Sequence, residues 1–68
     1  MISQDDVEPG DLVEWYNPLA HRTITALVLE KPWVSGDYWV FEAQANGEKF
    51  VKELTDRVNV IKKGRRDY

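Results

Sequence analysis

Hydrophobic and polar residues alternate along most of this chain with the period of a β-strand, in which successive side chains point to opposite faces. The clearest example is a pair of segments, residues 38–44 and 48–54, joined at Asn46-Gly47. Both residues of this pair tolerate positive φ, and Asn-Gly between two alternating segments is a strong short-range signal for a β-hairpin. The pattern therefore predicts a hairpin around which the rest of the fold is built.

The register of this hairpin is left open by the sequence. Trp39, Phe41 and Ala43 share one face, which we take as the core face. A strict two-residue loop places Lys52 opposite Phe41, whereas a three-residue loop with a bulge places Val51 there. We favour the bulged form, because a slip of one residue exchanges buried and exposed side chains and Val51 is the better apolar partner.

Three further segments continue the strand pattern. Residues 12–16 alternate, with Val13 and Trp15 on one face. Residues 23–31 are rich in β-branched residues and apolar at every central position, so we expect both faces of this strand to be covered there. Residues 58–61 form a short last strand. The connections carry turn-forming Pro, Gly, Asn or Asp and comprise residues 8–11, 17–22, 33–37 and 55–57.

Five short strands without a convincing helix predict a small all-β barrel or a tight two-sheet sandwich, because an open sheet of this size would leave one apolar face in water. The 68 residues suffice for one domain. We expect a flexible arm or a single turn over residues 1–7, the barrel over residues 8–61 and a basic tail over residues 62–68 that does not pack. Unpaired strand edges would allow a monomer or a small homo-oligomer.

The chain contains no cysteine, which excludes disulfides and thiolate metal ligands. No apolar run reaches the roughly 20 residues of a membrane span. The N-terminal residues are acidic, unlike those of a signal peptide. We therefore expect a soluble cytoplasmic protein.

The formal net charge of −3 argues against nucleic acid as the main partner. The charges are unevenly placed, because residues 1–14 carry no Lys or Arg, whereas the charged residues of 57–68 are all basic except Asp67. The two ends would attract each other if the fold brought them together, although two solvated ends are the simpler interpretation. The basic tail could contact phosphate, but the acidic remainder of the domain favours a solvated tail. Its cations are Lys62, Lys63, Arg65 and Arg66.

No group of residues has the composition of a catalytic or metal site. His21 is the only histidine and lies in a polar loop without a second strong ligand nearby. Ser3 and Ser35 lie outside any Gly-x-Ser-x-Gly motif, and the four glycines are scattered singly. Asp5 and Asp6 lie in the expected arm, where nothing would hold their carboxylates in a catalytic geometry. We therefore expect no enzyme activity, cofactor or metal.

Aromatic residues give the best indication of a binding site. Trp39, Phe41 and Phe50 could fill much of a small core, which leaves other rings near the exit of the first strand and the loop before the third. Glu14 and Asp37 would add negative potential, and an acidic aromatic groove suits a cationic or proline-containing segment of a partner protein. The alternative is that these rings only cap the ends of the barrel. The candidate partner-binding residues are Trp15, Tyr16, Trp33, Asp37 and Tyr38.

The central hairpin resembles the third and fourth strands of an SH3 domain. The run 36–40, Gly-Asp-Tyr-Trp-Val, is similar to the Gly-Asp-Trp-Trp-Leu of that family. Residues 50–58 resemble the strand, 3₁₀ turn and short fifth strand that close the SH3 barrel, and residues 12–16 loosely resemble its Ala-Leu-Tyr-Asp-Tyr motif. The resemblance spans most of residues 8–61 and implies a five-stranded SH3-like barrel. In such a barrel the first-strand exit and the loop before the third strand form the ligand groove.

Three positions depart from the SH3 pattern. Lys52 stands where the family has a groove proline, Thr55 falls near the position of a groove tyrosine, and Tyr38 replaces the first tryptophan of the pair. The resemblance therefore supports the fold more than the binding of proline-rich peptides. The run 9–15, Pro-Gly-Asp-Leu-Val-Glu-Trp, also resembles short SH3-like proteins of tailed phages, many of which are accessory proteins.

Three functions follow from these patterns. The leading one is a non-enzymatic protein-interaction module that uses the acidic aromatic groove. The second is a small structural or accessory component of a phage particle or assembly, found in the host cytoplasm or the virion, whose arms order only in the assembly. The third is contact with nucleic acid through the basic tail.

Overall fold

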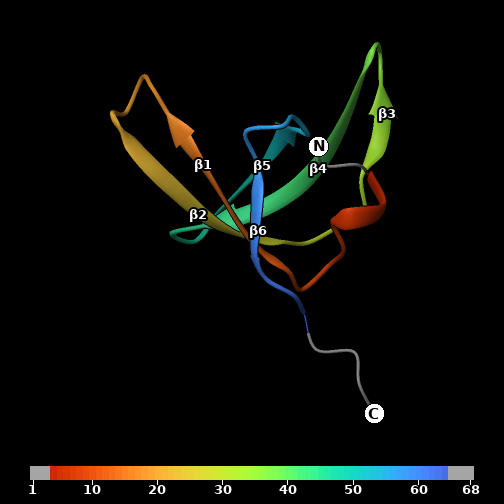
Figure 1. Ribbon diagram of the computed structural model, residues 1–68, viewed down its shortest axis with the longest axis horizontal. Helices are drawn as coiled ribbons and strands as arrows, with labels where there is room; N and C mark the ends of the chain where they lie inside the picture. Colours follow the sequence, from red (N-terminus) through yellow and green to blue (C-terminus); the bar gives the residue numbers. More distant parts are fainter. Residues whose placement is uncertain (1–3, 65–68) are drawn as a thin grey trace.

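The computed structural model describes residues 4–64, which form a curled antiparallel sheet preceded by the 3₁₀ helix η1 (Gln4–Asp6) (Figure 1). No α-helix occurs in this part of the chain, and the prediction of an all-β domain is confirmed. Accordingly, no helix among these residues is long and apolar enough to cross a membrane. The strands are β1 (Leu12–Asn17), β2 (Arg22–Val28), β3 (Trp33–Ser35), β4 (Tyr38–Ala45), β5 (Glu48–Glu53) and β6 (Asn59–Lys62).

The sheet is organised around β4, its longest strand. β5 pairs with one edge of β4, and β2 and β3 pair with successive parts of the other edge. β1 pairs with β2, and β6 returns to pair with the free edge of β1. The strands β5, β4, β2, β1 and β6 thus follow one another around a half-barrel, which stays open because β5 and β6 do not pair with each other over the described residues.

β3 occupies a segment that the sequence predicted as a loop, so the sheet has one strand more than the expected five. The chain reverses at Gly36 and Asp37, and Gly36 has a positive φ of 63° that glycine adopts without strain. β3 and the first part of β4 therefore form a second hairpin, which projects away from the half-barrel (Figure 1).

The β4–β5 hairpin has the strict two-residue turn, so the expectation of a bulge is wrong. Phe41 lies opposite Lys52, and Val51 faces outward with 58% of its surface exposed. Asn46 and Gly47 both have positive φ, 55° and 81°. This combination gives the turn a twist that matches the right-handed twist of the flanking strands, and it fixes the register.

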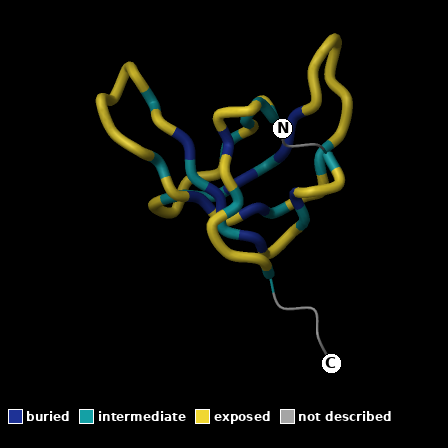
Figure 2. The backbone as a smooth tube through the Cα atoms, viewed as in Figure 1, coloured by how far each residue is buried: buried dark blue, intermediate teal, exposed yellow. Residues whose placement is uncertain are grey.

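The core lies inside the curl of the sheet, where the buried segments gather (Figure 2). Phe41 and Ala43 are fully buried, as predicted for alternate residues of β4, but Trp39 is partly exposed because it lies on the projecting hairpin. Leu27 is also partly exposed, so β2 is covered on one face only, contrary to expectation. The core residues are Val7, Val13, Trp15, Ala26, Val28, Phe41, Ala43 and Val58.

Trp15 is the centre of an aromatic cluster within this core. Its ring meets Phe41 edge-on with the centroids 6.4 Å apart, and it meets Phe50 at a tilt with the centroids 5.6 Å apart. The ammonium group of Lys52 lies 5.5 Å from the centre of the Trp15 ring. This cation–π contact explains how a lysine opposite Phe41 is accommodated on the core face.

Both ends of the described chain are packed more closely than the sequence predicted. Val7 is fully buried, so it belongs to the domain and not to the flexible arm expected over residues 1–7. Lys62 ends β6, and the next two residues contact Asp11, so the tail expected over residues 62–68 begins as part of the fold. Residues 1–3 and 65–68 of these two segments lie outside the described residues.

Candidate functional site

The structure divides the five predicted partner-binding residues among three places. Trp15 is only 6% exposed and belongs to the core, so it is not a surface residue. Tyr16 lies near the tip of the β1–β2 hairpin. Trp33, Asp37 and Tyr38 lie together on the β3–β4 hairpin. The two hairpins lie at opposite sides of the molecule in Figure 1, so the structure places Tyr16 apart from the other three.

The β3–β4 hairpin exposes aromatic side chains on both of its faces. Every residue of β3, of the turn and of the first two positions of β4 is exposed. Trp33 lies opposite Val40, and Val34 lies opposite Trp39. Because residues directly opposite in an antiparallel pair share a face, Trp33 and Tyr38 lie on the outer face and Val34 and Trp39 on the inner one. Trp33 is 40% exposed and Tyr38 59%.

The outer face of the sheet combines these rings with carboxylates. Val40 lies between Trp33 on β3 and Glu53 on β5, and Glu42 lies opposite Val51. Val40 is 7% exposed although it is outside the core cluster. We call this surface the outer patch, and it comprises Trp33, Tyr38, Val40, Glu42, Val51 and Glu53, with Asp37 on the adjoining turn.

The sequence holds a signal for this hairpin. Two short apolar runs flank Gly36-Asp37, a dipeptide typical of two-residue hairpin turns. The contributions of Val51 and Glu53 were not predicted, because they depend on the register of β5 against β4. In the bulged register, the residues that face outward on β5 would have been different ones.

Tyr16 contributes to a separate surface. It is 55% exposed and borders a hollow of about 390 Å³ together with Glu14 and Arg57. None of the residues that line this hollow belongs to the outer patch. Glu14, which was expected to add negative potential to one common groove, therefore acts at a different place from Asp37.

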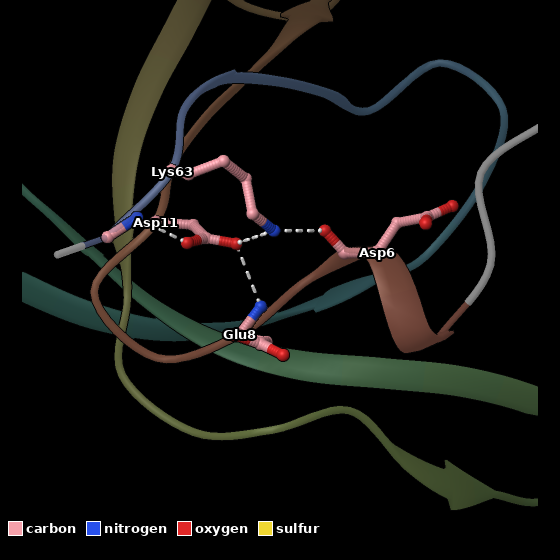
Figure 3. Close-up of polar contacts among 5 residues, drawn as sticks. Asp6, Glu8, Asp11 and Lys63 are labelled. Atoms are coloured by element: carbon pink, nitrogen blue, oxygen red, sulfur yellow. Dashed lines mark hydrogen bonds and ion pairs between the residues drawn. The ribbon is translucent and has the colours of Figure 1, made fainter. Parts of the chain in front are cut away.

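Asp11 joins the two ends of the described chain. Its buried carboxylate accepts hydrogen bonds from the backbone N–H of Glu8 at 2.9 Å, from the backbone N–H of Gly64 at 2.6 Å and from the ammonium group of Lys63 at 2.9 Å (Figure 3). The same ammonium group donates to the backbone carbonyl of Asp6 at 3.0 Å. The acidic and basic ends of the chain therefore do attract each other, through one ion pair whose acidic partner is buried.

The pKa of Asp11 reflects two opposing influences. Burial alone would raise the pKa, because it removes the charged form from water. The hydrogen bonds from Gly64, Lys63 and Glu8 favour the charged form, and together they hold the pKa of Asp11 below its ordinary value of 3.8. Asp11 is therefore a charged, structural group at neutral pH.

We call the contacts of Asp11 with Glu8, Lys63 and Gly64 the Asp11 clamp. This clamp reduces the set of cations that could contact phosphate. Lys63 is engaged by the Asp11 carboxylate, whereas Lys62 is exposed at the end of β6. Arg65 and Arg66, the other two predicted phosphate contacts, lie outside the described residues.

The described residues bring together no three His, Cys, Asp or Glu side chains that could hold a metal ion. The chemistry that the outer patch offers is flat stacking on two rings, together with charge pairing by nearby carboxylates. Comparisons of this chain with protein-family models, with curated proteins and with solved structures find no match. The resemblance to SH3 domains and to phage proteins therefore stays a prediction.

Proposed function

We propose that this domain is an SH3-like half-barrel that acts as a non-enzymatic protein-interaction module, with the outer patch as its contact surface. The observation that carries the proposal is the exposure of Trp33 and Tyr38 on one face of the projecting hairpin, with the carboxylate of Asp37 on its turn and those of Glu42 and Glu53 on the adjoining part of the sheet. Large rings exposed together on one surface are typical of residues that become buried by a partner.

The exposed rings are not needed to fill the core. The core cluster is complete without Trp33, Val34 or Tyr38. A hairpin that leaves apolar side chains in water loses the stabilisation that their burial would supply, about 25 cal/mol for each Å². A partner that covers the outer patch would recover that free energy on binding.

Charge indicates the chemistry of the partner. The outer patch and its turn carry the carboxylates of Asp37, Glu42 and Glu53. Nearby aromatic rings attract cations through their electron-rich faces. A segment that combines Lys or Arg with apolar residues therefore fits this surface best, in agreement with the cationic partner expected from the sequence.

One feature of the topology supports the SH3-like assignment. β6 follows the turn after β5 and returns to pair with β1, as the resemblance implies for the last strand of the barrel. Thr55 stabilises that turn, because its hydroxyl accepts a hydrogen bond from the backbone N–H of Arg57 at 3.2 Å.

The proposal is tested by selecting binders from a displayed library of random peptides with the immobilised full-length protein. We expect enrichment of peptides that carry Lys or Arg among apolar residues. An enriched peptide is then synthesised, and its Kd is measured by fluorescence anisotropy for the unmodified protein and for variants. Trp33→Ala should weaken binding about tenfold or more, as for buried aromatic anchors of interfaces.

Leu19→Ala is the matched control, because Leu19 is 94% exposed on the distant β1–β2 turn. It should leave the Kd unchanged. Glu53→Gln should weaken binding less than Trp33→Ala does and should reduce its salt dependence. Equal affinity for Trp33→Ala and the unmodified protein, or selection of acidic peptides, would contradict the proposal.

A further inference from the structure

The side chains on the inner face of the half-barrel change from apolar at one end to polar at the other. At one end, the inward positions hold core valines such as Val13 and Val28. At the other end, they hold polar side chains. Asn17 lies two residues beyond Trp15 on β1, and Arg22 lies opposite it on β2, so both continue the inward face.

The inward face of β5 also combines an apolar residue with charged ones. Phe50 lies opposite the buried Ala43 and faces inward. Its neighbours on that face, two residues away in each direction, are Glu48 and Lys52. Inward positions of β1, β2 and β5 thus place polar or charged side chains around the apolar residues of the inner face.

These strands surround a hollow of about 440 Å³. Its apolar lining includes Trp15, Ile24 and Phe50, and its polar lining includes Arg22, Lys52 and Glu48. The volume falls within the range of about 300–1,000 Å³ that is usual for small-molecule sites. A predominantly apolar floor with a few converging polar groups is also the usual composition of such sites.

The charges in this hollow favour an anion. Three cations, Arg22, Lys49 and Lys52, line the hollow together with one carboxylate, Glu48. By the strand register, Arg22 and Lys52 lie at inward positions, and within the part of the chain that the structure describes neither of these two forms an ion pair. Lys52 is held over the ring of Trp15, so its ammonium group is already positioned beside the aromatic floor.

We propose that this hollow binds a small organic anion with a flat apolar body and a single carboxylate. The body would lie against Ile24 and Phe50, and the carboxylate would pair with Arg22 and Lys52. Arg presents a planar set of donors that matches a carboxylate, so Arg22 fixes the orientation of the ligand. This site is distinct from the outer patch, because none of its lining residues belongs to that patch.

The test uses 2-naphthoate as the probe and 2-naphthamide, which has the same body without the charge, as the control ligand. Both are titrated into the ¹⁵N-labelled full-length protein and followed by two-dimensional NMR. We expect 2-naphthoate to shift the indole N–H signal of Trp15 and the backbone signals of Ile24 and Phe50. The indole signals of Trp33 and Trp39 should stay in place.

Charge-neutralising variants then identify the anion contacts. Arg22→Gln and Lys52→Gln should each weaken 2-naphthoate binding about tenfold, the loss expected for one charge-assisted contact. Lys31→Gln is the matched control, because Lys31 is an exposed lysine outside the hollow, and it should leave binding unchanged. Trp33→Ala should also have no effect, which separates this site from the proposed protein-binding surface.

Three outcomes would overturn the proposal. The first is equal binding of 2-naphthamide and 2-naphthoate, which would show that the charge is not recognised. The second is a set of shifts centred on Trp33 and Trp39, which would place the probe on the hairpin. The third is no shift of the Trp15 signal at millimolar probe concentrations.

Discussion

The packed core and the projecting β3–β4 hairpin use aromatic residues in opposite ways. Phe41 has no exposed surface and Trp15 has 6%, whereas Trp33 and Tyr38 are 40% and 59% exposed. The first two rings remove apolar surface from water within the domain, and the other two leave it accessible. The difference separates the aromatic residues that form the core from those whose surface stays accessible.

The contrast arises within a single strand. β4 begins at Tyr38 in the projecting hairpin and continues through Phe41 into the core. The first residues of β4 pair only with the three-residue β3, and pairing with β5 begins at Val40. The second half of β4 pairs with β2 on one edge and with β5 on the other. Figure 2 shows the same change as a passage from exposed to buried chain. Coverage by neighbouring strands, and not residue type, therefore decides which aromatic side chains of β4 are buried.

The strongest test of this contrast is Phe41→Ala. Truncation of a fully buried Phe costs about 3–5 kcal/mol, and a domain of this size rarely has more than about 3–5 kcal/mol of stability. We therefore expect the variant to be largely unfolded at 25 °C. Circular dichroism during a urea titration measures the change, and a urea midpoint close to that of the unmodified protein would contradict the assignment of Phe41 to the core.

Asp11→Asn tests the clamp that ties the two ends of the described chain to the sheet. The substitution keeps the size of the side chain but removes the charge that pairs with Lys63, and hydrogen bonds to charged groups contribute about 1.5–3 kcal/mol each. We expect the free energy of unfolding to fall by about 2 kcal/mol. Asp56→Asn, at an exposed aspartate of the β5–β6 turn, is the control and should have little effect.

The same clamp predicts a pH dependence. Because the folded pKa of Asp11 lies below 3.8, its contribution to stability is fully present above that ordinary value. It is lost as the pH falls through the folded pKa, since protonation removes the ion pair with Lys63. Urea midpoints measured from about pH 7 to about pH 2 should fall less steeply in Asp11→Asn than in the unmodified protein. Parallel curves for the two proteins would show that Asp11 makes no such contribution.

The smallest effect on stability is expected for Trp33→Ala. This side chain lies outside the core cluster and covers only the outer face, so we expect the free energy of unfolding to change by less than about 1 kcal/mol. The urea titration used for Phe41→Ala measures it. A loss comparable to that of Phe41→Ala would remove the distinction between the two regions and show that the hairpin is part of the core.

Residues of β1 and of the β4–β5 hairpin show which features of the fold can be predicted from the sequence. Alternation placed Val13 and Trp15 on one face of β1, and both are buried. It also placed Phe41 and Ala43 on the core face, and Asn46-Gly47 forms the predicted turn. Period and turn chemistry are local properties, so they can be read from neighbouring residues alone.

The candidate site was predicted less completely. Trp33, Asp37 and Tyr38 do lie together, but Trp15 fills the core and Tyr16 lies on another hairpin. An aromatic residue has the same local pattern whether it is buried or exposed. Its exposure depends on which strands cover it, and that information comes from residues far away in the chain.

The sequence by itself determined the all-β class, most of the strand positions and the main turn, because these follow from alternation and from residues that accept positive φ. Only the tertiary structure decided the register of β5, the burial of Val7 and the pairing of Asp11 with Lys63. Each of these depends on contacts between segments that are distant in sequence. The free energy of such contacts comes from the surface and charge that they bury together, which no single segment specifies.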